Sequence, residues 1–182
     1  MVKKVLIVFS IVIFVGGGIF IYWLRNQTNT EITSYLVSGI PVLEIKGPID
    51  GNGARKINEA LLKIEKSDAT SSILLIDTPG GEVHAGLRIS ERLLESEVKV
   101  YGLVKEAVAL GIYIVSSTDE IIFLIDGIAG AAGAAGAIVR NGKVYKEVGD
   151  LLFLNAEKAL ELNYSTQTVA SVEELALQIS KK

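Results

Sequence analysis

The stretch that decides the fold is Ile73-Leu-Leu-Ile-Asp-Thr-Pro-Gly-Gly-Glu-Val-His-Ala-Gly-Leu-Arg-Ile-Ser90, an apolar run followed by a Pro-Gly-Gly turn and an amphipathic segment. The run has the composition of a buried strand, and the segment after the turn has helical spacing. Gly80 and Gly81 lack side chains, so their backbone amides can lie close to a ligand. The helix that follows adds the positive end of its dipole. The turn is therefore predicted to bind a carbonyl oxygen or the oxyanion that forms from it.

Strand-like and helix-like segments alternate outward from this turn, which predicts an α/β fold with a mostly parallel sheet and flanking helices. The strand Ser72–Ile76 is apolar throughout, as is typical of a strand buried on both faces. The expected strands are Ile40–Ile45, Ser72–Ile76, Val98–Val104 and Glu120–Ile125. The expected helices are Gly51–Lys66, Glu82–Glu95, Ala107–Val115, a helix capped by Asn155 that runs to Leu162, and a last helix that begins at Ser171 with Glu174 in a capping box. One apolar stripe of the Glu82–Glu95 helix is expected to contain Val83, Leu87, Ser90 and Leu94.

The amino terminus has the features of a membrane anchor. Residues Val5–Tyr22 are almost entirely apolar, and this length can cross a bilayer as a helix. Lys3 and Lys4 precede the run, which predicts a cytoplasmic amino terminus and an extracytoplasmic domain. We expect a single-pass anchor at residues 1–25, a linker at 26–36 and one domain at 37–182. The alternative, a cleaved signal peptide, is disfavoured because Tyr22-Trp-Leu-Arg25 is a poor cleavage site.

Composition excludes several function classes. The chain has no cysteine and a single histidine, so thiolate catalysis, disulfides and Cys- or His-rich metal sites are not expected. The net charge is −3, and no basic cluster or aromatic-interleaved basic stripe is present, which argues against a nucleic-acid partner. No cofactor or metal is expected.

The order of short motifs resembles that of the crotonase-fold serine peptidases, the signal peptide peptidase A family and the Clp protease proteolytic subunit. The Pro-Gly-Gly turn is followed by a strand and then by Glu106-Ala-Val-Ala-Leu-Gly-Ile-Tyr-Ile114, which resembles the segment that carries the family's nucleophilic serine. Aligning Gly111 and Tyr113 with the family's glycine and tyrosine places Ala109 at the serine position. Further on, Gly142-Lys-Val-Tyr-Lys146 resembles the Gly-x-Tyr-Lys context of the family's general base, which makes Lys146 the candidate base.

The resemblance implies a crotonase/ClpP-like fold over about residues 40–177 and a Ser–Lys peptidase site whose oxyanion is bound by Gly80 and Gly81. It also implies a homo-oligomer, or assembly with an active paralogue. Gly130-Ala-Ala-Gly-Ala134 stands where these peptidases carry Gly-Ser-Ile-Gly, so Ala131 departs from the family pattern as Leu110 does.

The implied Ser–Lys site lacks its nucleophile, because the methyl group of Ala109 cannot attack a carbonyl. Ser116 or Ser117 could supply a hydroxyl, but Ser116 would lie roughly 10 Å further along the same helix. Lys146 is then either an ordinary surface lysine or a retained but idle site residue. His84 is expected to be partly exposed or to cap its helix, and Asp77 to hydrogen-bond turn amides.

Two functions from different classes remain open. In the first, the chain is an inactive, membrane-anchored relative of the Ser–Lys peptidases that binds peptide or a membrane-protein segment as a scaffold or regulator. In the second, it is an active membrane-bound peptidase that degrades signal peptides or membrane-protein segments, and Ala109 is an introduced Ser→Ala change. The departures at Leu110 and Ala131 favour natural loss. Acyl-CoA chemistry is a third and weaker possibility, because no convincing acid/base pair accompanies the amides.

Overall fold

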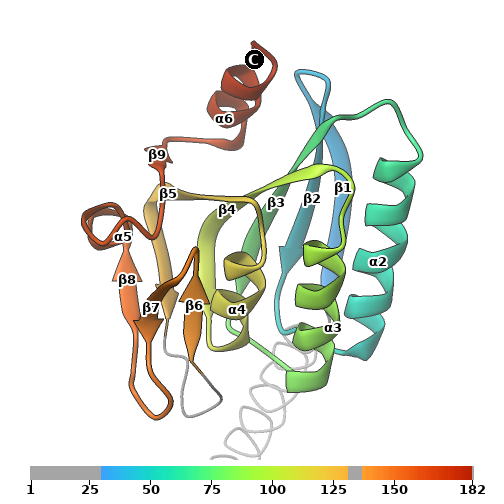
Figure 1. Ribbon diagram of the computed structural model, residues 1–182. Coiled ribbons are helices and arrows are strands. Elements are labelled where there is room, and N and C mark those ends of the chain that lie inside the picture. The colour runs from blue at the N-terminus through green and yellow to red at the C-terminus, as the bar shows by residue number, and fades with distance from the viewer. Residues whose placement is uncertain (1–29, 131–136, 182) are drawn as a thin grey trace, which may run out of the picture.

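One mixed sheet forms the centre of the molecule. The structure, a computed structural model, describes residues 30–130 and 137–181. The strand order is β1-β2-β3-β4-β5-β8, with β9 also paired to β5 (Figure 1). Strands β2 to β5 and β9 pair in parallel, while β1 and β8 pair antiparallel at the two ends. These strands are β1 (Glu31–Val37), β2 (Ile40–Lys46), β3 (Ser71–Thr78), β4 (Lys99–Val108), β5 (Glu120–Gly130), β8 (Phe153–Asn155) and β9 (Gln167–Val169).

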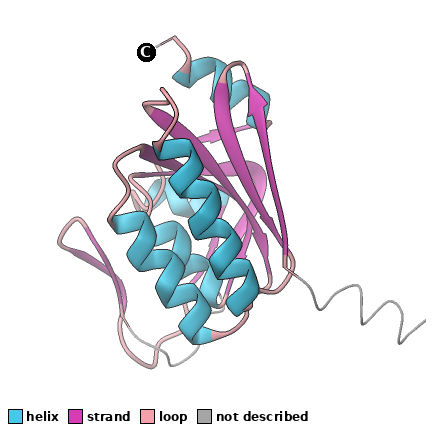
Figure 2. Cartoon of the chain, turned by 90° about the vertical axis from the view of Figure 1, so that its right-hand side faces the viewer, coloured by secondary structure: helices cyan, strands magenta, loops and turns pink. Residues whose placement is uncertain are grey.

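Helices cover both faces of this sheet. The described helices are α2 (Gly51–Glu65), α3 (Val83–Leu94), α4 (Leu110–Ser116), α5 (Ala156–Glu161) and α6 (Val172–Ile179), and a separate hairpin contains β6 (Ile138–Arg140) and β7 (Lys143–Lys146). Figures 1 and 2 show α2 and α3 side by side over one face. The expected mixed α/β fold with a mostly parallel sheet is confirmed.

Side chains that alternate along β3 divide the core into two layers. Leu74 and Ile76 pack in the cluster beneath α2 to α5, whereas Ile73 and Leu75 pack in the cluster that contains residues of α6. This alternation follows from the two-residue repeat of a strand. The strand is therefore buried on both faces, as its continuous apolar sequence indicated.

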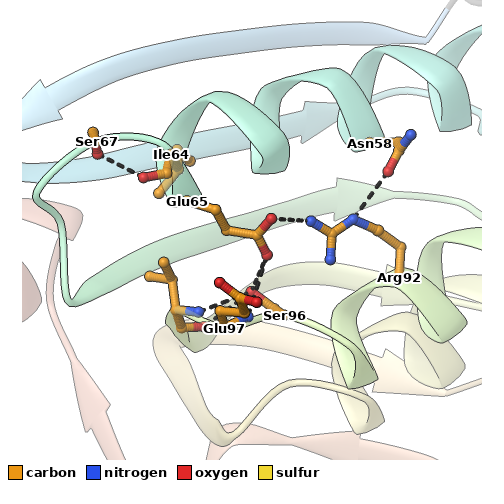
Figure 3. Close-up of polar contacts among 8 residues, drawn as sticks. Asn58, Ile64, Glu65, Ser67, Arg92, Ser96 and Glu97 are labelled. Atoms are coloured by element: carbon orange, nitrogen blue, oxygen red, sulfur yellow. Dashed lines mark hydrogen bonds and ion pairs between the residues drawn. The ribbon is translucent and has the colours of Figure 1, made fainter.

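Hydrogen bonds across the helix layer tie α2 to α3. The guanidinium of Arg92 donates to Glu65 through Nη2 and to Asn58 Oδ1 through Nε, the latter at 3.0 Å (Figure 3). Glu65 Oε1 also accepts from Ser96 Oγ and from the Glu97 amide, each at 3.2 Å. One carboxylate thus joins the end of α2 to the end of α3.

The predicted helix caps are confirmed at both later helices. Asn155 Oδ1 accepts from the Lys158 amide at 2.8 Å, and Ser171 Oγ accepts from the Glu174 amide at 3.3 Å. The Glu174 carboxylate reaches back to the Ala170 amide at 2.7 Å, one residue before the capping serine.

The apolar stripe expected on α3 faces solvent and not the core. Val83, Leu87 and Leu94 are 53, 47 and 73% exposed. The buried residues of α3 are Ala85, Gly86, Ile89, Ser90 and Leu93, so only Ser90 of the expected stripe is buried. The physical reason is at Gly86, where an added Cβ would lie 2.2 Å from the Leu110 side chain. The docking of α4 against this glycine sets the rotation of α3.

Three element boundaries also differ from the sequence prediction. Residues 31–36 of the expected linker form most of β1, because Ser38 and Gly39 (φ 50° and 81°) make a two-residue hairpin turn that pairs it with β2. The helix expected from Ala107 begins at Leu110, since β4 continues through Val108. Strand β5 likewise extends to Gly130.

The expected membrane anchor at residues 1–25 lies outside the described residues. Within residues 30–130 and 137–181, no helix combines the length and apolar character that crossing a bilayer requires.

Candidate functional site

The Pro-Gly-Gly turn is held by a set of hydrogen bonds to the neighbouring chain and to Thr78. The Ile49 amide donates to Gly80 O and the Glu82 amide donates to Ile49 O, both at 2.8 Å. The buried hydroxyl of Thr78 accepts from the Gly80 amide at 3.1 Å and donates to Gly47 O at 2.8 Å. A Cβ added to Gly81 would lie 2.0 Å from Ile49 O. Only glycine fits there, because the neighbouring chain approaches the backbone itself.

Ala109 occupies a strained turn between β4 and α4. Its φ of 48° and ψ of −105° lie in a region that residues with a Cβ rarely adopt. Such a conformation costs about 1–3 kcal/mol and clusters at functional sites. The Ala109 amide donates to Gly130 O at 2.7 Å, which ties the turn to β5. A sharp strand-to-helix turn of this kind is also how some hydrolases expose a nucleophile.

The structure brings Gly80 and Ala109 together, as the sequence predicted. A Cβ added to Gly80 would lie 2.9 Å from Ala109 Cβ and 3.5 Å from the Leu110 amide nitrogen. The residues are 29 positions apart in sequence, but parallel pairing of β3 with β4 places both turns at the same edge of the sheet.

The amides near Ala109 differ in whether they are available to a ligand. The Gly80 amide already donates to Thr78 Oγ1, whereas among the described residues the Gly81 amide donates to no other group. The Leu110 amide opens α4 and is one of the helix's first donors, which have no acceptor within the helix. Sequence reasoning missed Leu110. Its signal was its place directly after the nucleophile position and at the start of a helix.

Lys146 is buried and therefore not a surface lysine. It ends β7, is 3% exposed, and its Nζ donates to Glu147 O at 3.1 Å. Its strand partner Ile138 belongs to the same core cluster as Leu110. Most of the Gly130–Ala134 segment falls at residues 131–136, outside the description.

The other hydroxyls considered are engaged elsewhere. Ser116 Oγ donates to Ile112 O at 2.6 Å and lies 2.7 Å from the hydroxyl of Tyr164. Burial raises the pKa of that tyrosine well above its usual value, and its bond to Ser116 offsets only part of the rise. Ser117 Oγ donates to Tyr113 O at 3.1 Å. Both serines stand at the far end of α4 from Ala109.

The surroundings of His84 and Asp77 indicate structural roles for both residues. His84 is exposed at the start of α3, where Glu82 and not His84 is the capping residue. The carboxylate of Asp77 pairs with Lys105 Nζ at 2.8 Å and does not bind turn amides, which corrects the expectation. The hydrogen bond to Asp77 raises the pKa of Lys105.

Comparison with known sequences identifies relatives of the expected kind. A family model described as the NfeD1b N-terminal domain matches residues 37–144. The membrane protein NfeD1b of Bacillus subtilis is 28% identical over 201 residues, 89% of this chain and 45% of that protein. The ATP-dependent Clp protease proteolytic subunit of Streptococcus gordonii is 33% identical over 98 residues, 51% of this chain and 48% of that protein. The chain spans about half the length of the curated relatives it matches.

Solved structures share the fold. A serine-to-alanine mutant of the 1510-N membrane-bound stomatin-specific protease has a TM-score of 0.61 at 21% identity, over 72% of this chain and 80% of its own. The enoyl-CoA hydratase of Thermoplasma volcanium has a TM-score of 0.67 at 17% identity, over 83% of this chain and 77% of its own. The crotonase/ClpP-like fold is therefore confirmed, as is the relationship to the Clp proteolytic subunit.

Proposed function

Because the chain belongs to the family of NfeD1b N-terminal domains, we propose that it is a membrane-anchored, Clp protease-like domain that binds extended peptide without cleaving it. The observation that carries this proposal is the state of residue 109. The turn around it retains the strained backbone and the nearby glycine amides of a peptidase site, but its side chain is a methyl group. The machinery for holding a carbonyl is thus present without the group that attacks it.

Peptide binding follows from the donors at this site. The Gly81 and Leu110 amides are the two candidates to bind a peptide carbonyl, with the positive end of the α4 dipole behind Leu110. A lysine-to-alanine mutant of the stomatin-specific protease, which has a TM-score of 0.61 at 21% identity, was solved in complex with a substrate peptide. This neighbour supports an extended peptide as the ligand class for the fold.

Membrane attachment rests on the apolar segment Val5–Tyr22 and on relatives whose names include a membrane protein and a membrane-bound protease. The charges at Lys3 and Lys4 orient the amino terminus to the cytoplasm and the domain to the other side. In this arrangement the domain holds peptide or membrane-protein segments beside the bilayer, either as a homo-oligomer or next to an active paralogue.

Loss of the hydroxyl is expected to abolish peptidase chemistry. In serine hydrolases, removing the nucleophile lowers the rate by several orders of magnitude and leaves only binding and oxyanion contributions. The test restores the hydroxyl with Ala109→Ser in the full chain and follows labelled peptides by mass spectrometry. The wild type is expected to bind peptide, measured by fluorescence anisotropy. Both forms are expected to leave it intact, because Leu110 and Ala131 also depart from the pattern of the active peptidases.

Two outcomes would contradict the proposal. Hydrolysis by Ala109→Ser at about 10³-fold above background, lost again when Lys146→Ala is added, would make the chain a disabled but otherwise competent enzyme. Absence of any peptide binding by the folded wild type would remove the binding role. Ser117→Ala in the Ala109→Ser background is the matched control, since Ser117 bonds within α4.

The second candidate is an active membrane-bound peptidase in which Ala109 is an introduced change. One observation favours it, namely that the turn keeps a strained φ of 48° although alanine has no catalytic use for it. The buried Lys146 agrees with a retained base. Ala109→Ser, with and without Lys146→Ala, separates the two candidate functions.

A further inference from the structure

A groove lies at the end of the sheet opposite β8, far along the strand order from Ala109. It has a volume of about 390 Å³ and lies between β1 and the outer side of α2, which Figure 1 shows next to each other. Residues of β1 that line it are Ile32, Ser34, Tyr35 and Leu36, and those of α2 include Lys56, Glu59 and Lys63. Strand β1 pairs only with β2 among the described strands, so its other side is an open edge.

The hairpin geometry tells which backbone groups of β1 face this groove. Val37 and Ile40 flank the two-residue turn and are therefore a hydrogen-bonded pair. Alternation along an antiparallel ladder then directs the amides and carbonyls of Leu36, Ser34 and Ile32 away from β2. All three of these residues line the groove, together with Tyr35, whose backbone groups point toward β2.

Charges differ on the two sides of this edge. On the α2 side, Glu59 is already paired with Arg55 at 2.5 Å, whereas Lys56 and Lys63 have no ion pair within the described part of the chain. These lysines are seven residues apart, roughly 10 Å along the helix. On the α6 side, Glu44 and Glu173 act on Tyr35, whose pKa is raised by burial and by these two carboxylates.

We propose that this groove binds an extended acidic segment of a partner protein as an added strand on the open edge of β1. In an added strand, residues opposite Ile32, Ser34 and Leu36 face α2, and the residues between them face the α6 side. The lysines select carboxylates at the first set of positions. Glu44 and Glu173 disfavour carboxylates at the positions that face the α6 side. The peptide sequence that is recognised therefore alternates acidic with neutral residues.

A second copy of this chain fits the edge less well. Pairing two β1 strands about a two-fold axis places the two α2 helices on the same face of the joined sheet, with Lys56 and Lys63 of one copy toward those of the other. Like charges in this position oppose association. The acidic strand removes that repulsion.

The test uses the full chain in detergent and a fluorescein-labelled, end-capped Thr-Glu-Thr-Glu-Thr-Glu-Thr peptide. Binding is measured by anisotropy and is expected to weaken as salt rises from about 50 to about 500 mM. Charge reversal by Lys56→Glu with Lys63→Glu is expected to weaken it about tenfold or more. Lys66→Glu is the matched control, because Lys66 is exposed after the same helix but does not line the groove.

A backbone variant tests strand addition directly. Ser34→Pro removes one outward amide and retains the bonds of β1 to β2, because proline is tolerated on an edge strand. It should abolish peptide binding while circular dichroism and thermal stability stay close to wild type. Equal binding of a peptide with lysine in place of glutamate, or binding insensitive to both the lysine and proline variants, would overturn the proposal. Self-association that Ser34→Pro abolishes, without peptide binding, would overturn it in favour of a second copy.

Discussion

Glu65→Gln is expected to destabilise the fold because it removes the charge that joins α2 to α3. In the native state the Glu65 and Arg92 side chains are 12 and 14% exposed, and the Glu65 carboxylate accepts bonds from Arg92, Ser96 and the Glu97 amide. Hydrogen bonds to a charged group contribute about 1.5–3 kcal/mol each when lost with an unpaired partner left behind. Glutamine keeps an acceptor oxygen for Arg92, so a net loss of about 2 kcal/mol is expected.

The assay is thermal and urea unfolding of the full chain followed by circular dichroism. For a domain of this size, about 2 kcal/mol lowers Tm by roughly 4–8 °C. Glu59→Gln is the control on the same helix, since the pair of Glu59 with Arg55 is about half exposed and is worth at most about 0.5 kcal/mol.

The effect also has a pH signature. Burial alone would raise the pKa of Glu65, but the hydrogen bonds from Arg92, Glu97 and Ser96 outweigh it and hold that pKa below its ordinary value. A carboxyl with a depressed native pKa contributes stability above its unfolded pKa and loses it as pH falls through the native value. The difference in unfolding free energy between wild type and Glu65→Gln should therefore be largest at neutral pH and decrease in acid. Equal effects of the two glutamine variants, or a gap that persists unchanged in acid, would refute the reasoning.

Two further predictions concern the strained turn and the anchor. Ala109→Gly should stabilise the fold by about 1 kcal/mol, because relief of about 1–3 kcal/mol of backbone strain exceeds the entropy cost of glycine; a lower urea midpoint than wild type would show that the turn is unstrained. The full chain should remain in the membrane fraction after alkaline carbonate extraction, and a protease added to sealed right-side-out cells should digest residues 37–182. Release by carbonate, or protection of the domain, would contradict the proposed topology.

Much of the fold could be read from local patterns. The Pro-Gly-Gly turn, the continuous apolar run of β3 and the spacing of α2 and of the capped later helices are short-range signals, and each is found where expected. The strands that were missed are short or depend on their partners. Strand β1 is polar and mostly exposed, and only its pairing with β2 through the Ser38-Gly39 turn makes it a strand.

The amphipathic face of α3 shows why periodicity alone was insufficient. Two neighbouring stripes of this helix are both largely apolar, one with Val83, Leu87 and Leu94 and the other with Ala85, Ile89 and Leu93. Spacing cannot rank them, because both repeat with the helical period. The choice was made by the close approach of Leu110 to Gly86, a contact between residues far apart in the chain.

The sequence by itself determined the chemistry of this protein: a glycine turn suited to a carbonyl oxygen, an alanine where a hydroxyl would be required, and no cysteine to replace it. These are properties of residue identity, which folding does not change. Only the tertiary structure decided that Gly80 lies against Ala109, that Leu110 and not Gly80 has an amide available, and that Lys146 is buried. The reason is that parallel strands are joined through helices, so the groups that share one end of the sheet come from distant segments and meet only when the sheet has formed.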